Sequence, residues 1–264
     1  MLQYKEYTLP GTEWAAKDWI HLKETDSTNI QAARAAAAGG GHGMLVTADR
    51  QTAGKGRWGR SWESPAVGNL YFTLLLKPDL APDKASMLTL VMALSVSRAI
   101  RGLTGIDCGI KWPNDIVING RKVCGILTEM HVEKGRIRYV LIGVGINVVL
   151  QEFSPTLKEK ATSLEQEAGR KVSSKELLSR IMQDFEADYA GFCDCGNLQK
   201  LRQEYQDMLI NCNAQVRVLD PKGEYEGTAL GITETGELLV KTLDGRIEEV
   251  YAGEVSVRGI FGYV

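Results

Sequence analysis

The sequence predicts an α+β protein in which a large mixed domain of helices and strands precedes a small all-β domain. Helical and extended segments follow one another through the first 211 residues, whereas from Cys212 onward short alternating strands are separated by Gly and Asp turns. With 264 residues, 44% hydrophobic and 24% charged, the chain can bury a sizeable core. We therefore predict two domains, residues 1–211 and 212–264.

The charge balance argues against a surface that attracts nucleic acid as a whole. The formal net charge is -2, so any bound anion must be attracted by a local cluster of Lys and Arg. No continuous apolar run approaches the roughly 20 residues that cross a bilayer, and residues 1–14 lack the apolar core of a signal peptide. We expect a cytoplasmic protein without membrane association.

The five cysteines are odd in number and scattered, which is untypical of a disulfide framework in a chain of this length. The pair in CDCG has no histidine at a matching spacing, and a zinc site normally needs about four ligands. Free thiols are the expected state.

The elements of the large domain follow from periodicity and turn signals. We expect a helix that begins with Thr28 as its N-cap residue and ends at the glycines 39–41. Gln31 is expected to form the reciprocal hydrogen bond of a capping box. Asn119-Gly120 is a strong hairpin signal. The other expected elements are strands over 44–51, 69–77 and 136–150, a helix over 85–103, a polar loop over 151–171 and a helical region over 173–209.

The stretch GKGRWGRSW at 54–62 fits G-x-G-x-x-G and nearly fits a P-loop. Both patterns must open into a helix, which Pro65 and Gly68 forbid, and Arg60 stands where a P-loop has lysine. What remains is a basic, flexible loop whose guanidinium groups suit a carboxylate or phosphate. The alternative is a solvated turn with incidental charges.

Three further stretches combine glycines with polar side chains. KWPND (111–115) places a cation, a ring, an amide and a carboxylate on a bend, GRKVCG (120–125) sets a lysine after the hairpin turn, and GVGIN (143–147) ends a strand. Each taken alone is also explained by turn formation, a solvent-facing lysine or packing. Together they predict a shared site.

With STN at 27–29 and QTAGKGRWGRSW at 51–62, these stretches occur in the order and spacing of biotin protein ligases, which the chain resembles from about Asp26 onward. The resemblance implies a mixed-sheet, class II synthetase-like catalytic domain followed by an SH3-like β-barrel. It also implies an enzyme that adenylates biotin with ATP and Mg²⁺, releases pyrophosphate, and passes biotin from biotinyl-5'-AMP to a lysine of a biotin carboxyl carrier protein.

Joining two anions requires cations where charge builds in the transition state. By resemblance Arg57 and its loop close over biotin and the adenylate, Arg60 meets ATP phosphates, and Lys122 bridges the biotin carboxylate and the α-phosphate. Asp115 completes the implied catalytic set, either as a Mg²⁺ ligand or by assisting the acceptor lysine.

Binding residues are implied by the same motifs. Ser27, Thr28 and Gln51 match ureido-binding positions, and an unmade hydrogen bond in such a pocket costs about 1–3 kcal/mol. The implied biotin-binding set is Ser27, Thr28, Asn29, Gln51, Gly54, Lys55, Arg57, Lys122, Gly125 and Gly143. The implied ATP and adenylate set is Arg57, Arg60, Trp62, Asn114, Lys122 and Asn147.

Two departures from the family pattern concern charge and length. Lys55 and Trp58 make the loop less basic than in the most basic members, so a looser hold on the intermediate is expected. About 26 residues precede STN, too few for a helix-turn-helix domain, so we expect a monofunctional ligase that does not bind DNA. A homodimer is possible.

Two alternatives stay open at this point. A lipoate or octanoate ligase shares the fold, although the RRxSGGG stretch typical of that group is absent. A binding module without catalysis, for example one for nucleic acid, would use the same basic loop and predicts a strongly salt-dependent affinity.

Overall fold

The computed structural model describes residues 4–65, 68–220, 223–252 and 256–259. Its larger part is an eight-stranded sheet in the order β1-β2-β3-β4-β8-β7-β6-β5. The strands are β1 (Tyr4–Tyr7), β2 (Trp19–Thr25), β3 (Leu45–Gln51), β4 (Leu70–Leu76), β5 (Gly109–Lys111), β6 (Asp115–Ile118), β7 (Arg121–Glu133) and β8 (Arg136–Ile146).

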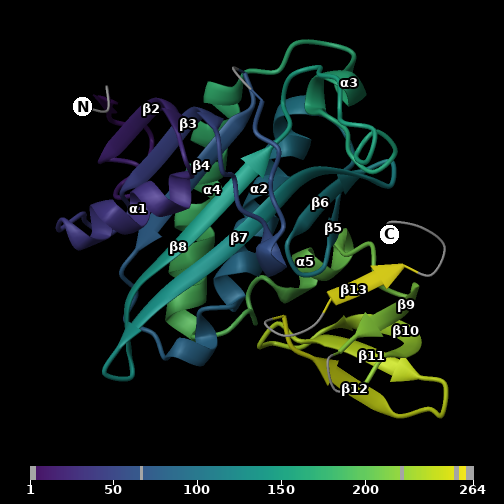
Figure 1. Cartoon of the computed structure of the whole chain (residues 1–264). Coiled ribbons are helices and arrows are strands. Elements are labelled where there is room, and N and C mark those ends of the chain that lie inside the picture. Colours follow the sequence, from purple (N-terminus) through teal and green to yellow (C-terminus); the bar gives the residue numbers. More distant parts are fainter. Residues whose placement is uncertain (1–3, 66–67, 221–222, 253–255, 260–264) are drawn as a thin grey trace.

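The sheet is mixed because a helix connects two of its strands. β2 and β3 pair in parallel through the crossover helix α1 (Thr28–Ala37), whereas the other neighbouring strands pair antiparallel. β7 and β8 form a long hairpin whose tip projects at the lower left of the view (Figure 1).

Helices cover both faces of this sheet. α1 packs on β3, β4 and β8, where its alanines allow a close approach and Ala32 is fully buried. α2 (Met87–Thr104) and α4 (Ser174–Cys195) pack together on the opposite face (Figure 1). The site described below lies on the α1 face.

The core helix α2 is apolar on most of its surface. In the part of the chain that the structure describes, the segment Pro82–Thr104 is the one helix whose length and composition would suffice to span a membrane, and 67% of its apolar window is buried in the protein. Polar residues such as Ser95 interrupt its sequence, so no continuous apolar run marks it.

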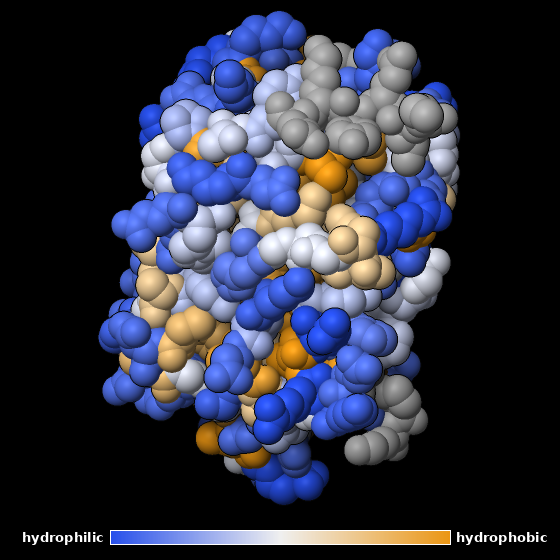
Figure 2. All heavy atoms as spheres, turned by 90° about the vertical axis from the view of Figure 1, so that its left-hand side faces the viewer, coloured by the Kyte–Doolittle hydropathy of each residue, from blue (hydrophilic) through white to orange (hydrophobic). Residues whose placement is uncertain are grey.

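Figure 2 shows one face of the molecule, where hydrophilic side chains surround small apolar patches.

The start of α1 corrects one sequence prediction. The helix begins at Thr28 with Ser27 as the extended N-cap residue, so Thr28 is not the cap. Gln31 does not form the reciprocal capping hydrogen bond, because its Nε2 donates to Oδ1 of Asp26 at 2.8 Å. The hydroxyl of Thr28 donates instead to Gln51 on β3. The residue predicted as a cap therefore belongs to the site.

Other elements refine the prediction. β1 and β2 were not predicted, and the expected polar loop over 151–171 contains the short helix α3 (Leu164–Ala168). The helical region over 173–209 divides at Gly196, whose φ of 66° ends α4, before α5 (Arg202–Met208) begins. Two short 3-10 helices, η1 (Arg57–Gly59) and η2 (Pro82–Lys84), complete the list.

The C-terminal part is a five-stranded antiparallel sheet in the order β12-β11-β10-β9-β13. Its strands are β9 (Gln215–Leu219), β10 (Tyr225–Ile232), β11 (Leu238–Thr242), β12 (Ile247–Val250) and β13 (Ser256–Gly259). The predicted fold class, a mixed catalytic sheet followed by a small β domain, is confirmed. The exact boundary at 211/212 stays a prediction.

Side chains of the large domain hold the C-terminal sheet in place. The buried indole of Trp112 donates to the carbonyl of Gly236 at 3.0 Å, and Arg202 of α5 donates to the carbonyl of Ile232 at 2.8 Å. The KWPND bend therefore has a structural role at Trp112 as well as a place near the site.

Candidate active site

The predicted motifs meet in one pocket on the α1 face of the sheet. Side chains in an antiparallel strand alternate between faces, and Gly125, Leu127, Gly143 and Gly145 share the pocket side of β7 and β8. The residues that line the pocket are Ser27, Thr28, Asn29, Gln51, Lys55, Gly56, Arg57, Trp62, Asn114, Lys122, Gly125, Ile126, Leu127, Gly143, Val144 and Gly145.

The glycines of β7 and β8 make room for two larger side chains. A methyl group at Gly143 would lie 2.1 Å from Oδ1 of Asn29, and one at Gly145 would lie 2.5 Å from Cε2 of Trp62. Any Cβ at these positions would displace those side chains, so close approach explains the glycines.

The basic loop folds back on itself instead of opening into a helix. The backbone N–H of Trp62 donates to the carbonyl of Gly54 at 2.9 Å, and that of Gly56 to the carbonyl of Arg60 at 2.7 Å. The chain then continues into β4, so the phosphate-binding helix of a Rossmann or P-loop fold is absent at this point of the described chain.

Lys122 forms the centre of the charged part of the site. Its Nζ lies 2.6 Å from Oδ1 of Asp115 and 5.1 Å from the ring centroid of Trp62. Its backbone is held by the carbonyl of Lys160 and the N–H of Thr162. The 151–171 segment thus supports the lysine that the resemblance singles out.

Arg57 links the loop to two distant segments. Its guanidinium donates to Oδ1 of Asn114 at 3.1 Å and to the backbone carbonyl of Ala252 in the C-terminal part. Burial lowers the pKa of Arg57, and the Asp115 carboxylate acts in the opposite direction.

Lys111 is a buried cation that belongs to the predicted KWPND motif but was not assigned a role in the site. It is 7% exposed and pairs with Asp115 across the β5–β6 bend. Burial lowers its pKa to about 8, the Asp115 charge opposes this, and the nearby cation Lys122 adds to it.

A continuous row of polar side chains runs beneath the neutral part of the pocket. Ser64 accepts from Gln51, whose Oε1 accepts both the backbone N–H and the hydroxyl of Thr28 at 2.8 and 3.1 Å. The row continues through Thr73 and Asn29 to the carboxylate of Glu129. Sequence motifs did not identify Thr73 and Glu129; the alternation Gly125, Leu127, Glu129 was the available signal for the latter.

Four predicted site residues lie outside the pocket lining. Gly54 forms the base of the loop, Arg60 is exposed, and Asp115 contacts the pocket through Lys122. The side chain of Asn147 is buried and donates to the carbonyl of Thr162 at 3.1 Å. The lining residues that the prediction did not include are Gly56, Ile126, Leu127 and Val144, whereas Gly145, predicted to line the pocket with its backbone, is among the lining residues.

Trp62 carries a donor that is suited to a ligand. Its indole Nε1 is buried and has no hydrogen-bond partner among the described residues. Burying an unpaired donor is unfavourable, so a ligand acceptor at this position would be bound favourably. The pocket volume is about 50 Å³, and a bicyclic ligand needs more.

Few side chains of the described residues could bind a metal ion or react as thiols in this site. Among the described residues, no three His, Cys, Asp or Glu side chains converge to hold a metal ion. All five cysteines are free thiols. Beside Arg57 and Lys122, the Asn114 amide and the Asp115 carboxylate supply oxygen atoms, a set that suits Mg²⁺ when phosphates supply the remaining ligands.

Fold and site together define the class of proteins described as the "Biotin/lipoate A/B protein ligase family", whose model matches residues 41–147. The model "Biotin protein ligase C terminal domain" matches residues 212–258. The first match contains the basic loop, KWPND, Lys122 and the paired glycines.

Relatives narrow the class to one family. The bifunctional ligase/repressor BirA of Bacillus subtilis is 39% identical over 249 residues, covering 93% of this chain and 76% of that protein. The biotin--[acetyl-CoA-carboxylase] ligase of Paracoccus denitrificans is 32% identical, covering 90% and 100%. The Aquifex aeolicus biotin protein ligase solved with biotin and ATP superposes with a TM-score of 0.79 at 33% identity, covering 91% and 98%. The chain belongs to the biotin protein ligase family.

Proposed function

We propose that this protein adenylates biotin with ATP and transfers the biotinyl group to a lysine of a biotin carboxyl carrier protein. The observation that carries this function is one pocket that joins the polar row from Gln51 to Asn29 with the cations Arg57 and Lys122. The row suits the hydrogen-bonding ureido group, and the cations suit the carboxylate and phosphate that react.

In the first step a biotin carboxylate oxygen attacks the α-phosphorus of ATP. The bond from that phosphorus to the bridging oxygen of the β-phosphate breaks, and pyrophosphate leaves with the electron pair. Lys122 stabilises the negative charge shared by the two reacting groups, because a charged donor in a partly desolvated site acts strongly on a transition state. Its contact with Trp62 and Asp115 holds the ammonium group at this position.

In the second step the neutral amine of the acceptor lysine attacks the acyl carbon of the adenylate. The acyl–oxygen bond breaks, AMP leaves with the electron pair, and the amine loses a proton to solvent water. The Asp115 carboxylate, 15% exposed and 2.6 Å from Nζ of Lys122, fits the role of orienting the incoming amine.

Mg²⁺ would supply a positive charge that neutralises the departing pyrophosphate. Asn114 and Asp115 are the residues of this chain that would hold it. The amide of Asn114 already orders Arg57, and its Nδ2 donates to the carbonyl of Ile126 at 3.0 Å. These residues therefore position both the cation-binding oxygens and the loop.

The basic loop has to move before both substrates bind. Trp62, at the end of the loop, lines a pocket of about 50 Å³, which is smaller than a bicyclic ligand needs, and the loop is held by the Arg57 contacts with Asn114 and Ala252. Opening admits the substrates, and closing encloses the mixed anhydride away from water.

The acceptor's identity, a homodimer, the lack of DNA binding and a cytoplasmic location remain predictions. The family acts on carrier proteins, and the net charge of -2 supports weak interaction with nucleic acid. Analytical ultracentrifugation with and without biotin and ATP tests the dimer.

Mass spectrometry of a purified carrier domain tests the function directly. Incubation with the protein, ATP, Mg²⁺ and biotin should add one biotinyl group to one lysine. Replacing biotin by lipoate or octanoate should leave the carrier unmodified. Modification with lipoate and not with biotin would assign the protein to the rival ligase, and a salt-dependent affinity for nucleic acid without modification would favour a binding module.

A further inference from the structure

The polar row beneath the pocket ends on a carboxylate that touches none of the predicted site groups except Asn29. Glu129 lies on β7 two residues beyond Leu127, on the pocket face, and its Oε2 accepts from Nδ2 of Asn29 at 2.6 Å. A carboxylate only accepts hydrogen bonds when ionised, so it determines which end of the Asn29 amide faces it.

The orientation of Asn29 determines the direction of the next hydrogen bond. With Nδ2 facing Glu129, Oδ1 faces the hydroxyl of Thr73 at 2.5 Å. Thr73 is fully buried, and its hydroxyl also lies 2.9 Å from the hydroxyl oxygen of Thr28. A threonine hydroxyl has one hydrogen, so the two oxygens compete for it. An amide oxygen has no hydrogen of its own, and the 2.5 Å contact therefore requires the hydrogen of Thr73.

The other end of the row is fixed independently. The backbone N–H of Thr28 donates to Oε1 of Gln51 at 2.8 Å, so this oxygen is an acceptor whatever the hydroxyls do. The hydroxyl of Thr28 donates to the same oxygen at 3.1 Å. With the hydrogen of Thr73 committed to Asn29, the oxygen of Thr28 keeps its lone pairs for another donor. Thr28 lines the pocket.

We infer that Glu129 is a positioning residue that, through Asn29 and Thr73, makes the Thr28 hydroxyl a hydrogen-bond acceptor for an N–H group of the ligand. This inference rests on the proposed function, in which that N–H belongs to the ureido ring of biotin. If the Asn29 amide turned, Nδ2 would face Thr73, and the hydrogen of Thr73 would pass to Thr28 and occupy one of its two lone pairs, which would leave Thr28 with a single lone pair for the ligand. Glu129 thereby controls specificity without touching the ligand.

The position of Asn29 leaves it little freedom except this turn. Oδ1 and Nδ2 would lie 2.1 and 3.0 Å from a methyl group at Gly143, so the amide packs directly on the β8 backbone. Asn29 is 4% exposed. A rotation of the amide by half a turn exchanges oxygen and nitrogen while the shape stays the same.

The test reverses the direction of the hydrogen bonds along the polar row. Glu129→Lys places a donor opposite Asn29 and should turn the amide, whereas Glu129→Gln keeps an oxygen that accepts from Nδ2. Glu133→Lys, with the same change of charge at an exposed position of the same strand, is the matched control. The probes are biotin and two biotin analogues, each methylated at one ureido nitrogen, with ATP as the reference ligand, all titrated by calorimetry.

The wild type should bind biotin more tightly than at least one methylated analogue by about 10- to 100-fold, the cost of leaving an acceptor unpaired. Glu129→Lys should reduce that ratio at least about fivefold through weaker biotin binding, with ATP affinity unchanged. Glu129→Gln and Glu133→Lys should keep the ratio. If Glu129→Lys does not fold, Glu129→Leu, which removes the acceptor, is compared with Glu129→Gln in its place.

The inference is overturned if the lysine or leucine variant keeps the wild-type ratio, or if biotin, its analogues and ATP all weaken together. Biotin-dependent exchange of pyrophosphate into ATP by the wild type separates the two claims. Exchange with an unchanged ratio rejects the role of Glu129 and leaves the function standing, whereas absence of exchange rejects the function itself.

Discussion

The guanidinium of Arg57 donates a hydrogen bond to the backbone carbonyl of Ala252, a residue 195 positions further along the chain. The basic loop of the catalytic part is therefore fastened to the C-terminal part. The same side chain donates to Asn114 in the KWPND bend, so one residue ties together three segments around the pocket.

Removing this side chain should release the intermediate. We expect Arg57→Gly to lose both fastening contacts, so that the loop opens and biotinyl-AMP escapes into solution. The measurement is biotin labelling of an unrelated lysine-containing protein, which should rise several-fold. Arg50→Gly, an exposed change on β3, should leave labelling at the wild-type level. Unchanged labelling by Arg57→Gly would contradict the closing role.

Gly143 should be intolerant of any side chain. Because a methyl group there would lie 2.1 Å from Oδ1 of Asn29, Gly143→Ala should displace Asn29 and weaken biotin binding by about 10-fold or more. Gly41→Ala is the matched control, since nothing lies within 4 Å of a methyl group at that position. Calorimetric titration with biotin measures both, and equal affinities would show that the close approach is not required.

The sequence carried most of the fold and the charged part of the site. The loop, KWPND and the hairpin lysine are local patterns, so their residues were recognisable without coordinates. Only part of the polar row could be predicted from the sequence, because Thr73 and Glu129 join it through strand pairing and not through neighbours in the sequence. Arg57 and Ala252 likewise meet through tertiary packing.

Helix starts and partners were harder to predict for a related reason. Thr28 fits a cap by local rules, yet its hydroxyl donates to Gln51 on β3, and Ser27 takes the cap position. The buried Trp112 in KWPND has no local signal for its contact with Gly236. Tertiary hydrogen bonds override local preference in both places.

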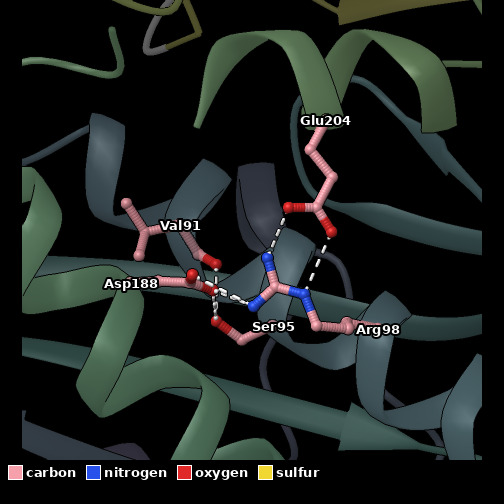
Figure 3. Close-up of polar contacts among 5 residues, drawn as sticks. All are labelled: Val91, Ser95, Arg98, Asp188 and Glu204. Atoms are coloured by element: carbon pink, nitrogen blue, oxygen red, sulfur yellow. Dashed lines mark hydrogen bonds and ion pairs between the residues drawn. The ribbon is translucent and has the colours of Figure 1, made fainter. Parts of the chain in front are cut away.

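A partly buried network of three charged side chains connects the helices behind the sheet (Figure 3). Arg98 of α2 lies between Asp188 of α4, at 3.1 Å, and Glu204 of α5, at 2.6 Å. Asp188 also accepts from Ser95 at 2.8 Å, and burial raises its pKa while these partners oppose the shift. The network fixes α5, from which the chain continues into the C-terminal sheet.

Asp188→Ala should therefore destabilise the protein. It leaves Arg98 with one of its two partners and Ser95 with the carbonyl of Val91 as its remaining acceptor, and we expect a loss of about 1–3 kcal/mol in the free energy of unfolding. Asp194→Ala on the same helix breaks an exposed pair with Lys200 and should cost well under about 1 kcal/mol. Urea denaturation measures both; equal losses would remove the network's role in stability.

Lys111 should make the free energy of unfolding depend on pH in the alkaline range. Its pKa in the folded protein is lowered to about 8, so between that pH and its ordinary pKa of about 10.5 the unfolded chain binds the extra proton. Stability contributed by this group therefore rises with pH across that window and is lost as pH falls through about 8.

Lys111→Met removes this dependence. Relative to the wild type, the methionine variant should be most stable below about pH 8. As pH rises toward 10, the difference in stability should shift in favour of the wild type. Exposed Lys77→Met should differ from the wild type by a constant amount. Denaturation midpoints at several pH values provide the comparison, and parallel curves for Lys111→Met would contradict the lowered pKa.

The central claim is that cations in one pocket allow a carboxylate and a phosphate to react, with Lys122 at the centre. Biotin-dependent exchange of labelled pyrophosphate into ATP tests it most directly. The wild type and Lys158→Ala, a change of an exposed lysine, should both exchange, whereas Lys122→Ala should fold normally and lose about 10²- to 10³-fold in rate. Exchange by Lys122→Ala within a few-fold of the wild type would contradict the account.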